Sequence, residues 1–477
     1  MIRRQESSGA RAAPLVDLGP RSRRRPVARH VAPDGPASNN DRPAERSSID
    51  GLNQKRPRIG VLYPSGWGNL GDEAILQATF ESLRQQWPNV ALRAFTLHPA
   101  RTSANHGVDA EPLTGLNRPL FGAPRSTNPF LVRAVESLAH RTRHVPVIWR
   151  LTRWASQHTA NAVFEIQSLA SARRWLKGAD LVLASGGGQL DDVWGGAWGQ
   201  PYALARWAWL SKRAGVPFAF FSVGFGGASS WLSRRFLRYA VDNAAYCSVR
   251  DQGSRTLTKA LGVRRELRVV PDLAFGLSAG TRPPHRPAGY DIGVSPMTYL
   301  RPGSWPKPDG NEYQRFIALW VDIVSTIVKE GNRAHLFVSA PEDMAAVTDV
   351  WDRLGEEVRS QASIDQATTP NALLEFYQGV DVVISSRLHG VLLAFVGGTP
   401  VVALSHERKV RRLMADAGAG SLCVELDAAT SDQTMAMVRA LLAELAPRRE
   451  SLRQFVDQAK AAVVEQQAML PQLLRAQ

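Results

Sequence analysis

Two series of short apolar runs, each run followed by a helical segment, constrain this chain more than any other feature of its sequence. The first series has runs at 58–63, 91–97, 179–184, 217–223, 245–249 and 267–270, and the second at 291–295, 334–339, 382–384, 401–404 and 423–426. Strands that alternate with helices are typical of parallel sheets covered by helices on both faces. A stretch rich in Pro and Arg, 278–288, separates the two series as a linker. We therefore predict an α/β protein with two doubly wound, Rossmann-like domains, 57–277 and 289–477, with a cleft between them and long helices at the C-terminal end.

The segment before the first apolar run has a different composition. Residues 1–56 carry eleven Arg and one Lys against six acids and show no apolar periodicity. Such a segment cannot bury enough surface to fold, so we predict a disordered basic tail. It lacks the apolar core of a secretory signal, and it has no aromatic residues to stack on bases. We therefore expect no export and no nucleic-acid partner.

The cysteines and the apolar runs of the sequence indicate in which cellular compartment the protein is located. The two cysteines, Cys247 and Cys423, each lie in an apolar run, which fits buried thiols of a reducing compartment such as the cytoplasm. No apolar run reaches the ~18 residues of a membrane-spanning helix.

The stretch from Asp381 to Ser405 holds the first candidate site. Two apolar strands, 382–384 and 401–404, flank a buried helix at 390–396, and the polar motif Ser385 to His389 follows the first strand. Ligands of parallel sheets bind at the carboxyl ends of strands. An arginine and a histidine between apolar elements predict an anion site there, and the alternative is an internal salt bridge with a buried histidine of structural role.

The first strand also leads into a candidate site. Gly66 to Gly71 has the spacing G-x-G-x-x-G between a strand and a helix, which would favour a dinucleotide. Asp72 and Glu73, however, occupy the helix start that a pyrophosphate would need, and the next strand ends at His98 with no acid for a ribose. The two acids either cap their own helix or contact a sugar hydroxyl.

Two further strands of the first series end in residues suited to ligands. Ser185 to Gln189 contains three glycines whose N–H groups can face an anion or a sugar. Asp191 and Asp192 follow, and without further ligands at metal spacing we interpret them as caps or sugar contacts rather than as a metal site. Arg250 ends the strand 245–249. If Arg250 and Arg387 both face the cleft, one small dianion can bridge the domains.

A region near 130–177 is predicted to be a helical insertion rich in Arg and Trp. Such a stretch could lie on an anionic membrane face or line an acceptor groove, and a solvated helix face is the simpler interpretation.

Taken together, these motifs resemble those of the polysaccharide pyruvyl transferase family. The resemblance covers about 58–427, apart from 99–177, and rests on Gly66-Trp-Gly-Asn-Leu-Gly-Asp-Glu-Ala-Ile-Leu76, Ser185-Gly-Gly-Gly188, Ser248-Val-Arg-Asp251, Pro271-Asp272, Ser386-Arg-Leu-His-Gly390, Pro400-Val-Val-Ala-Leu404 and Lys409. It implies the two-domain arrangement of B-type glycosyltransferases and transfer of the enolpyruvyl group of phosphoenolpyruvate onto a sugar hydroxyl, commonly as a cyclic ketal. The implied acceptor is a bacterial exopolysaccharide or cell-wall saccharide, which a lipid could carry at the inner membrane face. The resemblance implies no metal and no cofactor besides phosphoenolpyruvate as co-substrate.

The resemblance also implies roles for single residues. Arg250 and Arg387 would bind phosphoenolpyruvate, His389 would be the general acid or a phosphate ligand, and Asp72 would orient or deprotonate the acceptor hydroxyl. Further substrate contacts would come from Asn69, Gly71, Gly187, Gly188, Leu388 and Lys409. The sequence departs from the family pattern at Gln189 and at Ser222 to Gly226, which predicts an unusual acceptor surface.

Two other functions remain open at this point. A B-type glycosyltransferase that uses a nucleotide sugar would need an acid for the donor ribose, and the C-terminal half offers only Glu407. A non-catalytic anion-binding protein of a polysaccharide pathway would keep Arg387 and lose the acid-base residue, whereas His389 is present.

Overall fold

A computed structural model describes residues 56–66, 68–116, 137, 140, 146–193, 195–283, 289–305 and 307–474. The predicted tail therefore lies outside the described residues, apart from Arg56. Most of 130–145 in the predicted insertion and 284–288 of the predicted linker lie outside them as well.

The first sheet has seven strands, all paired in parallel, in the order β3-β2-β1-β4-β6-β8-β9. Its strands are β1 (Arg58–Leu62), β2 (Ala91–Thr96), β3 (Asp109–Pro112), β4 (Leu181–Ser185), β6 (Phe218–Val223), β8 (Tyr246–Val249) and β9 (Arg268–Val269). Every residue of β4, β6 and β8 is buried, as expected for central parallel strands with both faces covered. The predicted runs match these strands, whereas β3 follows no run that the sequence indicated.

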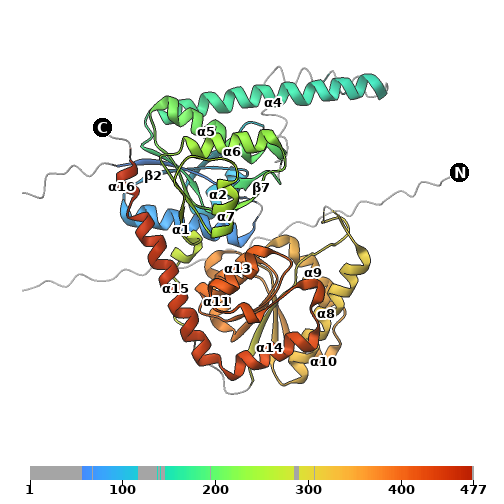
Figure 1. Cartoon of the computed structure of the whole chain (residues 1–477). Coiled ribbons are helices and arrows are strands. Elements are labelled where there is room, and N and C mark those ends of the chain that lie inside the picture. The colour runs from blue at the N-terminus through green and yellow to red at the C-terminus, as the bar shows by residue number, and fades with distance from the viewer. Residues whose placement is uncertain are drawn as a thin grey trace, which may run out of the picture. The chain divides into compact units, whose positions relative to one another are not determined.

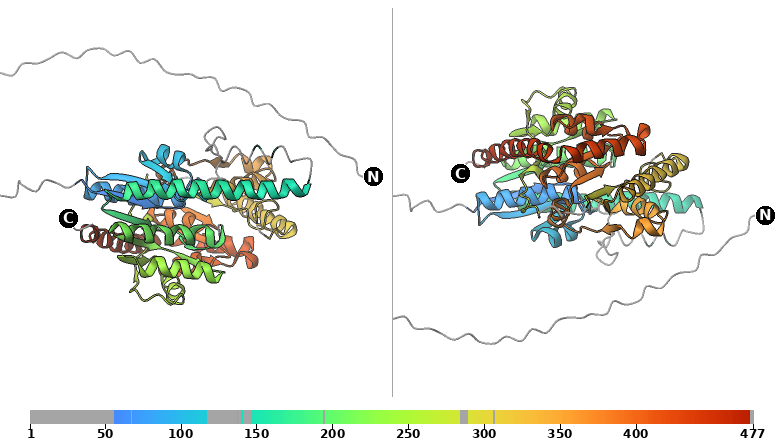
Figure 2. Two further views of the ribbon diagram at one scale, coloured as in Figure 1. Left: turned by 90° about the horizontal axis from the view of Figure 1, so that it is seen from above. Right: turned by 90° about the horizontal axis from the view of Figure 1, so that it is seen from below.

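Helices cover both faces of this sheet (Figure 1). They are α1 (Leu70–Gln86), α2 (Pro99–His106), α4 (Pro146–Leu176), α5 (Gln200–Ala214), α6 (Trp231–Asp242) and α7 (Gln252–Lys259). Alternate residues of β1 show the two layers, because Ile59 and Val61 join the core that contains α1, while Leu62 joins the core that contains residues of α4, α5 and α6. Figure 2 (left) shows α4 as a long rod, and α5 packs against both α4 and α6.

The second sheet has six parallel strands in the order β12-β11-β10-β13-β14-β15. They are β10 (Asp291–Ser295), β11 (Arg333–Phe337), β12 (Ala362–Asp365), β13 (Val382–Ser385), β14 (Val401–Leu404) and β15 (Cys423–Val424). Its helices are α8 (Gly310–Lys329), α9 (Met344–Trp351), α10 (Glu356–Arg359), α11 (Pro370–Gly379), α12 (Leu388–Val396), α13 (Arg408–Asp416) and α14 (Ser431–Ala443). The two parallel sheets with their covering helices confirm the predicted fold class. We refer to the parts built on the first and second sheets as the first and second lobes.

Helix α12 begins earlier than the sequence suggested. We expected it to start at Gly390, but it starts at Leu388, with Arg387 as its N-cap residue. Leu388 and His389 therefore lie in the first helical turn rather than in a loop. The Arg387 side chain does not cap the first N–H groups of this helix, so they are left for another acceptor.

The chain crosses back to the first lobe at its end. Helix α15 (Leu445–Gln467) and the short α16 (Leu470–Leu473) follow α14, with Pro447 in the first turn of α15. Gln466 near the end of α15 is buried and hydrogen-bonds to Ser222, Ser248 and Tyr246 at the ends of β6 and β8. This helix therefore contributes to the packing of the first sheet, although it lies in the segment predicted to belong to the C-terminal domain.

Helix α1 joins the two lobes. Its first N–H, from Leu70, donates to the carbonyl of Ser339 beyond β11 at 2.9 Å, and Gln77 donates to Asn371 at 2.7 Å. Helix α1 also packs against α11 and α12, and one hydrophobic core runs through it from β1 to β10 and β13. The starts of α1 and α12 are therefore fixed against each other, and the predicted site residues lie at these starts.

Candidate active site

The N-termini of α1 and α12 bring residues of both lobes together. A Cβ atom added at Gly71 would overlap the imidazole of His389, so the backbone of α1 packs directly on that ring. Asn69 caps α1 by accepting a hydrogen bond from Gly71 N–H at 2.9 Å. Leu388, beside His389, is 9% exposed and belongs to the shared core. The sequence-predicted residues from the two lobes thus form one contact.

Asp72 lies in the same contact, next to a tyrosine that the sequence analysis had not singled out. The Tyr63 hydroxyl donates to the Asp72 carboxylate at 2.8 Å. Burial raises the pKa of Asp72 above its ordinary value, while nearby His389 and the Tyr63 hydroxyl oppose that rise. Burial and the neighbouring Asp72 raise the pKa of Tyr63, so it stays a donor. A Cβ at Gly187, where φ is +64°, would overlap this hydroxyl, which explains why glycine is needed there.

Arg250 reaches the same place from the end of β8. Its guanidinium lies 3.4 Å from the buried Asp272 carboxylate and 3.6 Å from that of Asp251. Asp272 also accepts from the N–H of Ala274, because it caps the 3-10 helix Leu273–Gly276. The Arg250 side chain is 12% exposed, and a Cβ at Gly224 would collide with its guanidinium. Arg250 is therefore held in one direction by two carboxylates and a glycine.

The imidazole of His389 has an unusual electrostatic setting. Burial lowers the pKa of His389 below its ordinary value, Asp272 and Asp72 raise it, and Arg250 and Lys409 lower it further. Burial is the largest of these influences, so without a ligand the ring holds a proton less readily than an exposed histidine. Its Nε2 is buried and has no hydrogen-bond partner among the residues that the structure describes.

Two buried hydroxyls near these helix starts also lack partners within the described part of the chain. They belong to Ser65, between β1 and α1, and to Ser386, just before α12. Buried polar groups normally find a partner. Together with the free N–H groups at the start of α12 and with His389 Nε2, they indicate a place for a polar, anionic ligand.

Arg387, the second predicted arginine, points to different partners. Its Nε lies 2.6 Å from one oxygen of Asp343 and its Nη2 lies 2.7 Å from the other, so the pair is bidentate. Glu342 adds a third contact at 3.4 Å. Asp343 is 1% exposed and also accepts from Thr298 N–H at 2.9 Å. The structure thus places Arg250 with His389 and gives Arg387 the internal salt bridge that we had weighed as the alternative.

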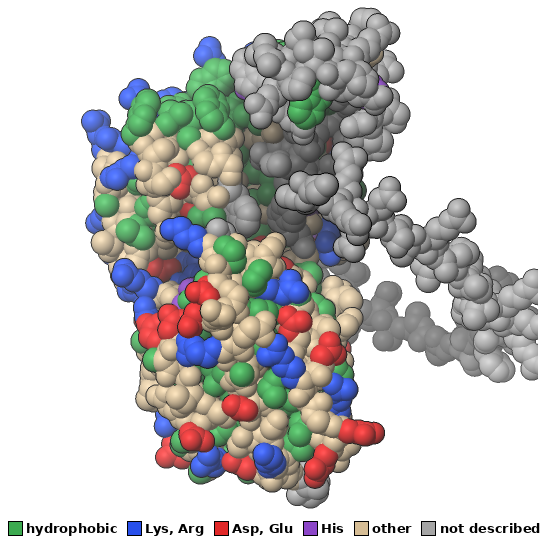
Figure 3. All heavy atoms as spheres, turned by 90° about the vertical axis from the view of Figure 1, so that its right-hand side faces the viewer, with side chains coloured by type: hydrophobic (Ala, Val, Ile, Leu, Met, Phe, Trp, Pro, Cys, Tyr) green, Lys and Arg blue, Asp and Glu red, His purple; other side chains and the backbone are tan. Residues whose placement is uncertain are grey.

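Lys409 and Asp191 complete the charged surroundings. Lys409, in the first turn of α13, lies 3.0 Å from Glu407 and is half-exposed. Asp191 follows the triple glycine, and a Cβ at Gly188 would approach its carboxylate. Burial raises the pKa of Asp191 to about 6, while Val193 N–H, Lys409 and Arg250 oppose the rise. Asp191 therefore keeps its proton to a higher pH than an exposed carboxyl, although cations of both lobes lower its pKa. Figure 3 shows charged side chains gathered where the lobes meet.

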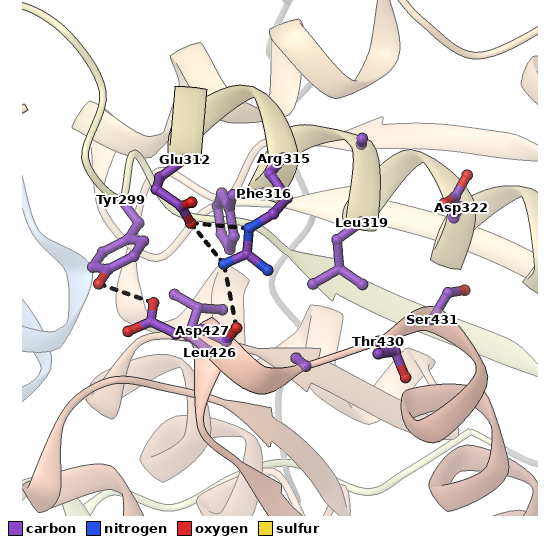
Figure 4. Close-up of a pocket in the computed structure, with 12 residues that line it drawn as sticks. Tyr299, Glu312, Arg315, Phe316, Leu319, Asp322, Leu426, Asp427, Thr430 and Ser431 are labelled. Atoms are coloured by element: carbon purple, nitrogen blue, oxygen red, sulfur yellow. Dashed lines mark hydrogen bonds and ion pairs between the residues drawn. The ribbon is translucent and has the colours of Figure 1, made fainter. Parts of the chain in front are cut away.

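Two cavities lie elsewhere in the second lobe. The one in Figure 4, of about 280 Å³, lies between α8 and the segment 426–431. Its Arg315 pairs with Glu312, and Tyr299 donates to Asp427 at 3.1 Å. The other, of about 270 Å³, is lined by Asp291 at the start of β10, by His335 and Asp365 of the neighbouring strands and by residues that precede β13. No predicted site residue lines either cavity. Among the described residues, no group of three or more His, Cys, Asp or Glu is arranged to hold a metal ion.

The arrangement of two Rossmann-like lobes is shared with several solved structures. The structure of Anabaena HepE in complex with UDP has 13% identity and a TM-score of 0.52, and the match covers 87% of this chain and 99% of that one. UDP-GlcNAc 2-epimerase from Neisseria meningitidis has 10% identity and a TM-score of 0.50, covering 86% and 99%. A putative UDP-N-acetylglucosamine 2-epimerase from Listeria monocytogenes has 10% identity and a TM-score of 0.52, covering 87% and 96%. These likenesses show the B-type glycosyltransferase-like fold.

The sequence narrows this fold class to one family. Residues 69–408 match the family model described as polysaccharide pyruvyl transferase. Because the match covers most of the chain, this protein belongs to the polysaccharide pyruvyl transferase family. It is therefore a transferase that modifies polysaccharide. A search of curated proteins found no match.

Proposed function

We propose that this protein transfers the enolpyruvyl group of phosphoenolpyruvate onto a saccharide and forms a pyruvate ketal. The observation that carries this proposal is the imidazole of His389. It stands at the open N-terminus of α12, close enough to Arg250 for their charges to interact, with Nε2 unpartnered among the described residues. Phosphoenolpyruvate, with a phosphate and a carboxylate, suits a guanidinium and a helix N-terminus.

The chemistry follows from these groups. Binding of the dianion beside His389 would raise the pKa of that imidazole, so the ring takes up a proton. The imidazolium then protonates the methylene carbon of phosphoenolpyruvate, which becomes a methyl group and leaves an oxocarbenium-like centre at C2. One acceptor hydroxyl adds to C2, phosphate departs with the electrons of its C2–O bond, and a second hydroxyl closes the ketal. Two hydroxyl protons are lost in total: one replaces the proton that His389 gave and the other goes to the released phosphate.

Asp72 is proposed as the group that accepts the first hydroxyl proton and passes it to His389, where it replaces the proton that the imidazolium gave. Its carboxylate lies with His389 and is oriented by the Tyr63 hydroxyl at 2.8 Å. A pKa raised by burial makes Asp72 a stronger base than an exposed carboxylate. Asn69, Gly71, Gly187, Gly188 and Leu388 shape the backbone around these groups, and Lys409 adds positive charge.

We also propose a cytoplasmic enzyme that acts on a bacterial exopolysaccharide or cell-wall saccharide carried on a lipid. Both cysteines are free thiols, and Cys247 is buried, which supports a reducing compartment. No helix among the described residues has the length and apolar character needed to cross a membrane.

The decisive test is turnover by the purified full chain. We expect phosphate release from phosphoenolpyruvate that depends on added saccharide, and a product heavier by one pyruvyl ketal in mass spectrometry. Cell polysaccharide with and without the intact gene should differ by the same increment. Thermal stabilisation by nucleotide sugars but not by phosphoenolpyruvate would instead favour a glycosyltransferase. Tight binding of phosphoenolpyruvate with no pyruvylated product in either assay would favour a non-catalytic anion-binding protein.

A further inference from the structure

The first lobe exposes large apolar side chains close to the candidate site. Val193, Trp198 and Trp231 are 70%, 58% and 74% exposed, and we call these three residues the apolar rim. Tryptophan is mostly buried in folded proteins, and each exposed indole leaves a large apolar area in water. Two such residues on one lobe mark an interaction surface.

The rim is held in place by packing beneath it. Trp198 ends a short 3-10 turn, Gly196–Trp198, and its ring centroid lies 5.5 Å from that of Tyr202 on α5 and 5.8 Å from that of Phe236 on α6. Trp231 is the first residue of α6, whose N-cap Ser230 accepts from the Ser233 N–H. The indoles are therefore displayed on rigid elements.

The surface around the rim is positively charged. The segment 193–241 contains six Lys and Arg residues and no Asp or Glu. Arg206 is buried and paired with Glu165, which leaves five exposed cations: Lys212, Arg213, Arg234, Arg235 and Arg238. Three of these lie on α6, directly after Trp231. On the face in Figure 3, hydrophobic side chains gather on the first lobe with Lys and Arg side chains around them.

A short connection joins the rim to the candidate site. Asp191 interacts with Arg250 and Lys409 of the site, whereas the next residue, Asp192, points to α6. Its carboxylate accepts from Ser229 N–H and Oγ, both at 2.8 Å, and from Ser230 N–H at 3.3 Å. The strand β5 (Leu190–Asp191) also pairs with β7 (Phe225–Gly227). The rim thus begins two residues after a charged residue of the site and is tied to the start of α6.

We propose that the apolar rim and the arginines of α6 dock this protein on an anionic lipid bilayer. Indoles lie favourably at the headgroup level, and clustered Lys and Arg are attracted to anionic lipids. A neutral saccharide would also stack on indoles, but it would gain nothing from the five exposed cations, of which only Arg238 pairs with a described acid, Asp242 at 3.5 Å. Docking here would bring the site to the membrane surface, where a lipid-carried acceptor is presented. The inference does not depend on phosphoenolpyruvate chemistry.

The experiment is co-sedimentation of the full chain with vesicles. We expect binding to vesicles of phosphatidylcholine with phosphatidylglycerol, weak binding to phosphatidylcholine alone, and release at high salt. Arg234→Glu with Arg235→Glu should weaken binding at least about tenfold, given roughly fivefold per basic residue. Trp198→Ser with Trp231→Ser should also weaken it severalfold.

Matched controls separate docking from folding and from catalysis. Lys307→Glu with Lys329→Glu makes the same charge change on the second lobe, and Val464→Ser removes an apolar side chain that is 52% exposed. Both controls should bind vesicles like the wild type. The rim variants should keep the wild-type melting temperature and phosphate release with a short water-soluble saccharide, so a failure of docking and a failure of the proposed reaction are distinguishable.

Three outcomes would overturn the proposal. They are equal binding to neutral and anionic vesicles, unchanged binding by both double variants, and binding of soluble polysaccharide that the rim variants lose while vesicle binding is absent. The last would identify the rim as a saccharide platform.

Discussion

Arg250 and Arg387 occupy equivalent places in the two lobes and have different surroundings. Each follows a buried parallel strand, β8 or β13, and each is largely buried. Arg250 makes longer contacts to its carboxylates, at 3.4 and 3.6 Å, and faces His389. Arg387 makes bidentate contacts to Asp343 at 2.6 and 2.7 Å. A loosely paired guanidinium can accept a ligand at little cost, whereas a tightly paired one must first give up its partner.

The comparison teaches that a basic residue at a strand end has two physical roles. In the first lobe it is loosely paired beside the candidate site, and in the second it is tightly paired at the start of the helix that carries His389. We therefore expect substitutions at the two positions to change different measurements, and the following variants test this.

The largest effect should come from His389, the residue on which Arg250 acts. In His389→Asn we expect kcat to fall about 10²–10⁴-fold, because the asparagine cannot protonate the methylene carbon. Binding of phosphoenolpyruvate, followed by thermal shift, should persist. Gly71→Ala serves as a second probe, since its methyl group would overlap the imidazole. A His389→Asn enzyme with near-normal kcat would remove the histidine from the chemistry.

Arg250→Gln should produce the next largest effect. Loss of a charge-assisted contact of about 1.5–3 kcal/mol lowers kcat/KM for phosphoenolpyruvate roughly 10–150-fold. Arg255→Gln, one turn into α7, is the matched control and should stay near wild type. If Arg387→Gln lowered kcat/KM as much as Arg250→Gln and left stability unchanged, the contrast between the two arginines would be wrong.

Arg387→Gln should act mainly on stability. The substitution leaves the Asp343 carboxylate, which is 1% exposed, without its guanidinium, and we expect a loss of about 2 kcal/mol in the free energy of unfolding. The loss would appear as a lower melting temperature with a change in KM for phosphoenolpyruvate below about tenfold. A double-mutant cycle with Asp343→Asn should show strong coupling. Additive effects would mean that the pair is not a unit.

The sequence was sufficient for the central strands of both sheets, because strands buried on both faces are continuous apolar runs. It was not sufficient for β3 and β12, whose residues are only half-buried or exposed and whose sequences, DAEP and ASID, carry no apolar run. The early start of α12 was missed because Arg387 is a poor indicator of an N-cap.

Of the site, strand-end position predicted the residues from α1, β8 and α12 that the fold brings together. Tyr63 bonds to Asp72 nine positions later, Asp191 lies near Arg250 and Lys409 from distant parts of the sequence, and the Arg387–Asp343 pair spans 44 positions. The pattern of residue types at neighbouring sequence positions does not indicate which side chains will pair in the fold. Asp272 had a signal, since Pro271-Asp272 belongs to the motifs of the family resemblance, but its contact with Arg250 emerges only from the fold.

The smallest effect concerns Asp191, which lies near the same cations as His389. Because burial raises its pKa to about 6, the folded protein holds this proton more tightly than the unfolded chain does. Stability from this group is fully present below about pH 4 and is lost as the pH rises through about 6. Asp191→Asn should therefore raise the free energy of unfolding at pH 8 by roughly 1–2 kcal/mol, which appears as a higher melting temperature, and leave it unchanged at pH 4.

The Asp191→Asn variant should also bind phosphoenolpyruvate more tightly at pH 8, since a negative charge beside Arg250 and Lys409 is removed. Asp180→Asn, near β1 and away from the site, is the control and should not strengthen ligand binding. A melting-temperature difference that is the same at both pH values would show that Asp191 titrates normally, and the site around Arg250 would then be wetter than its packing indicates.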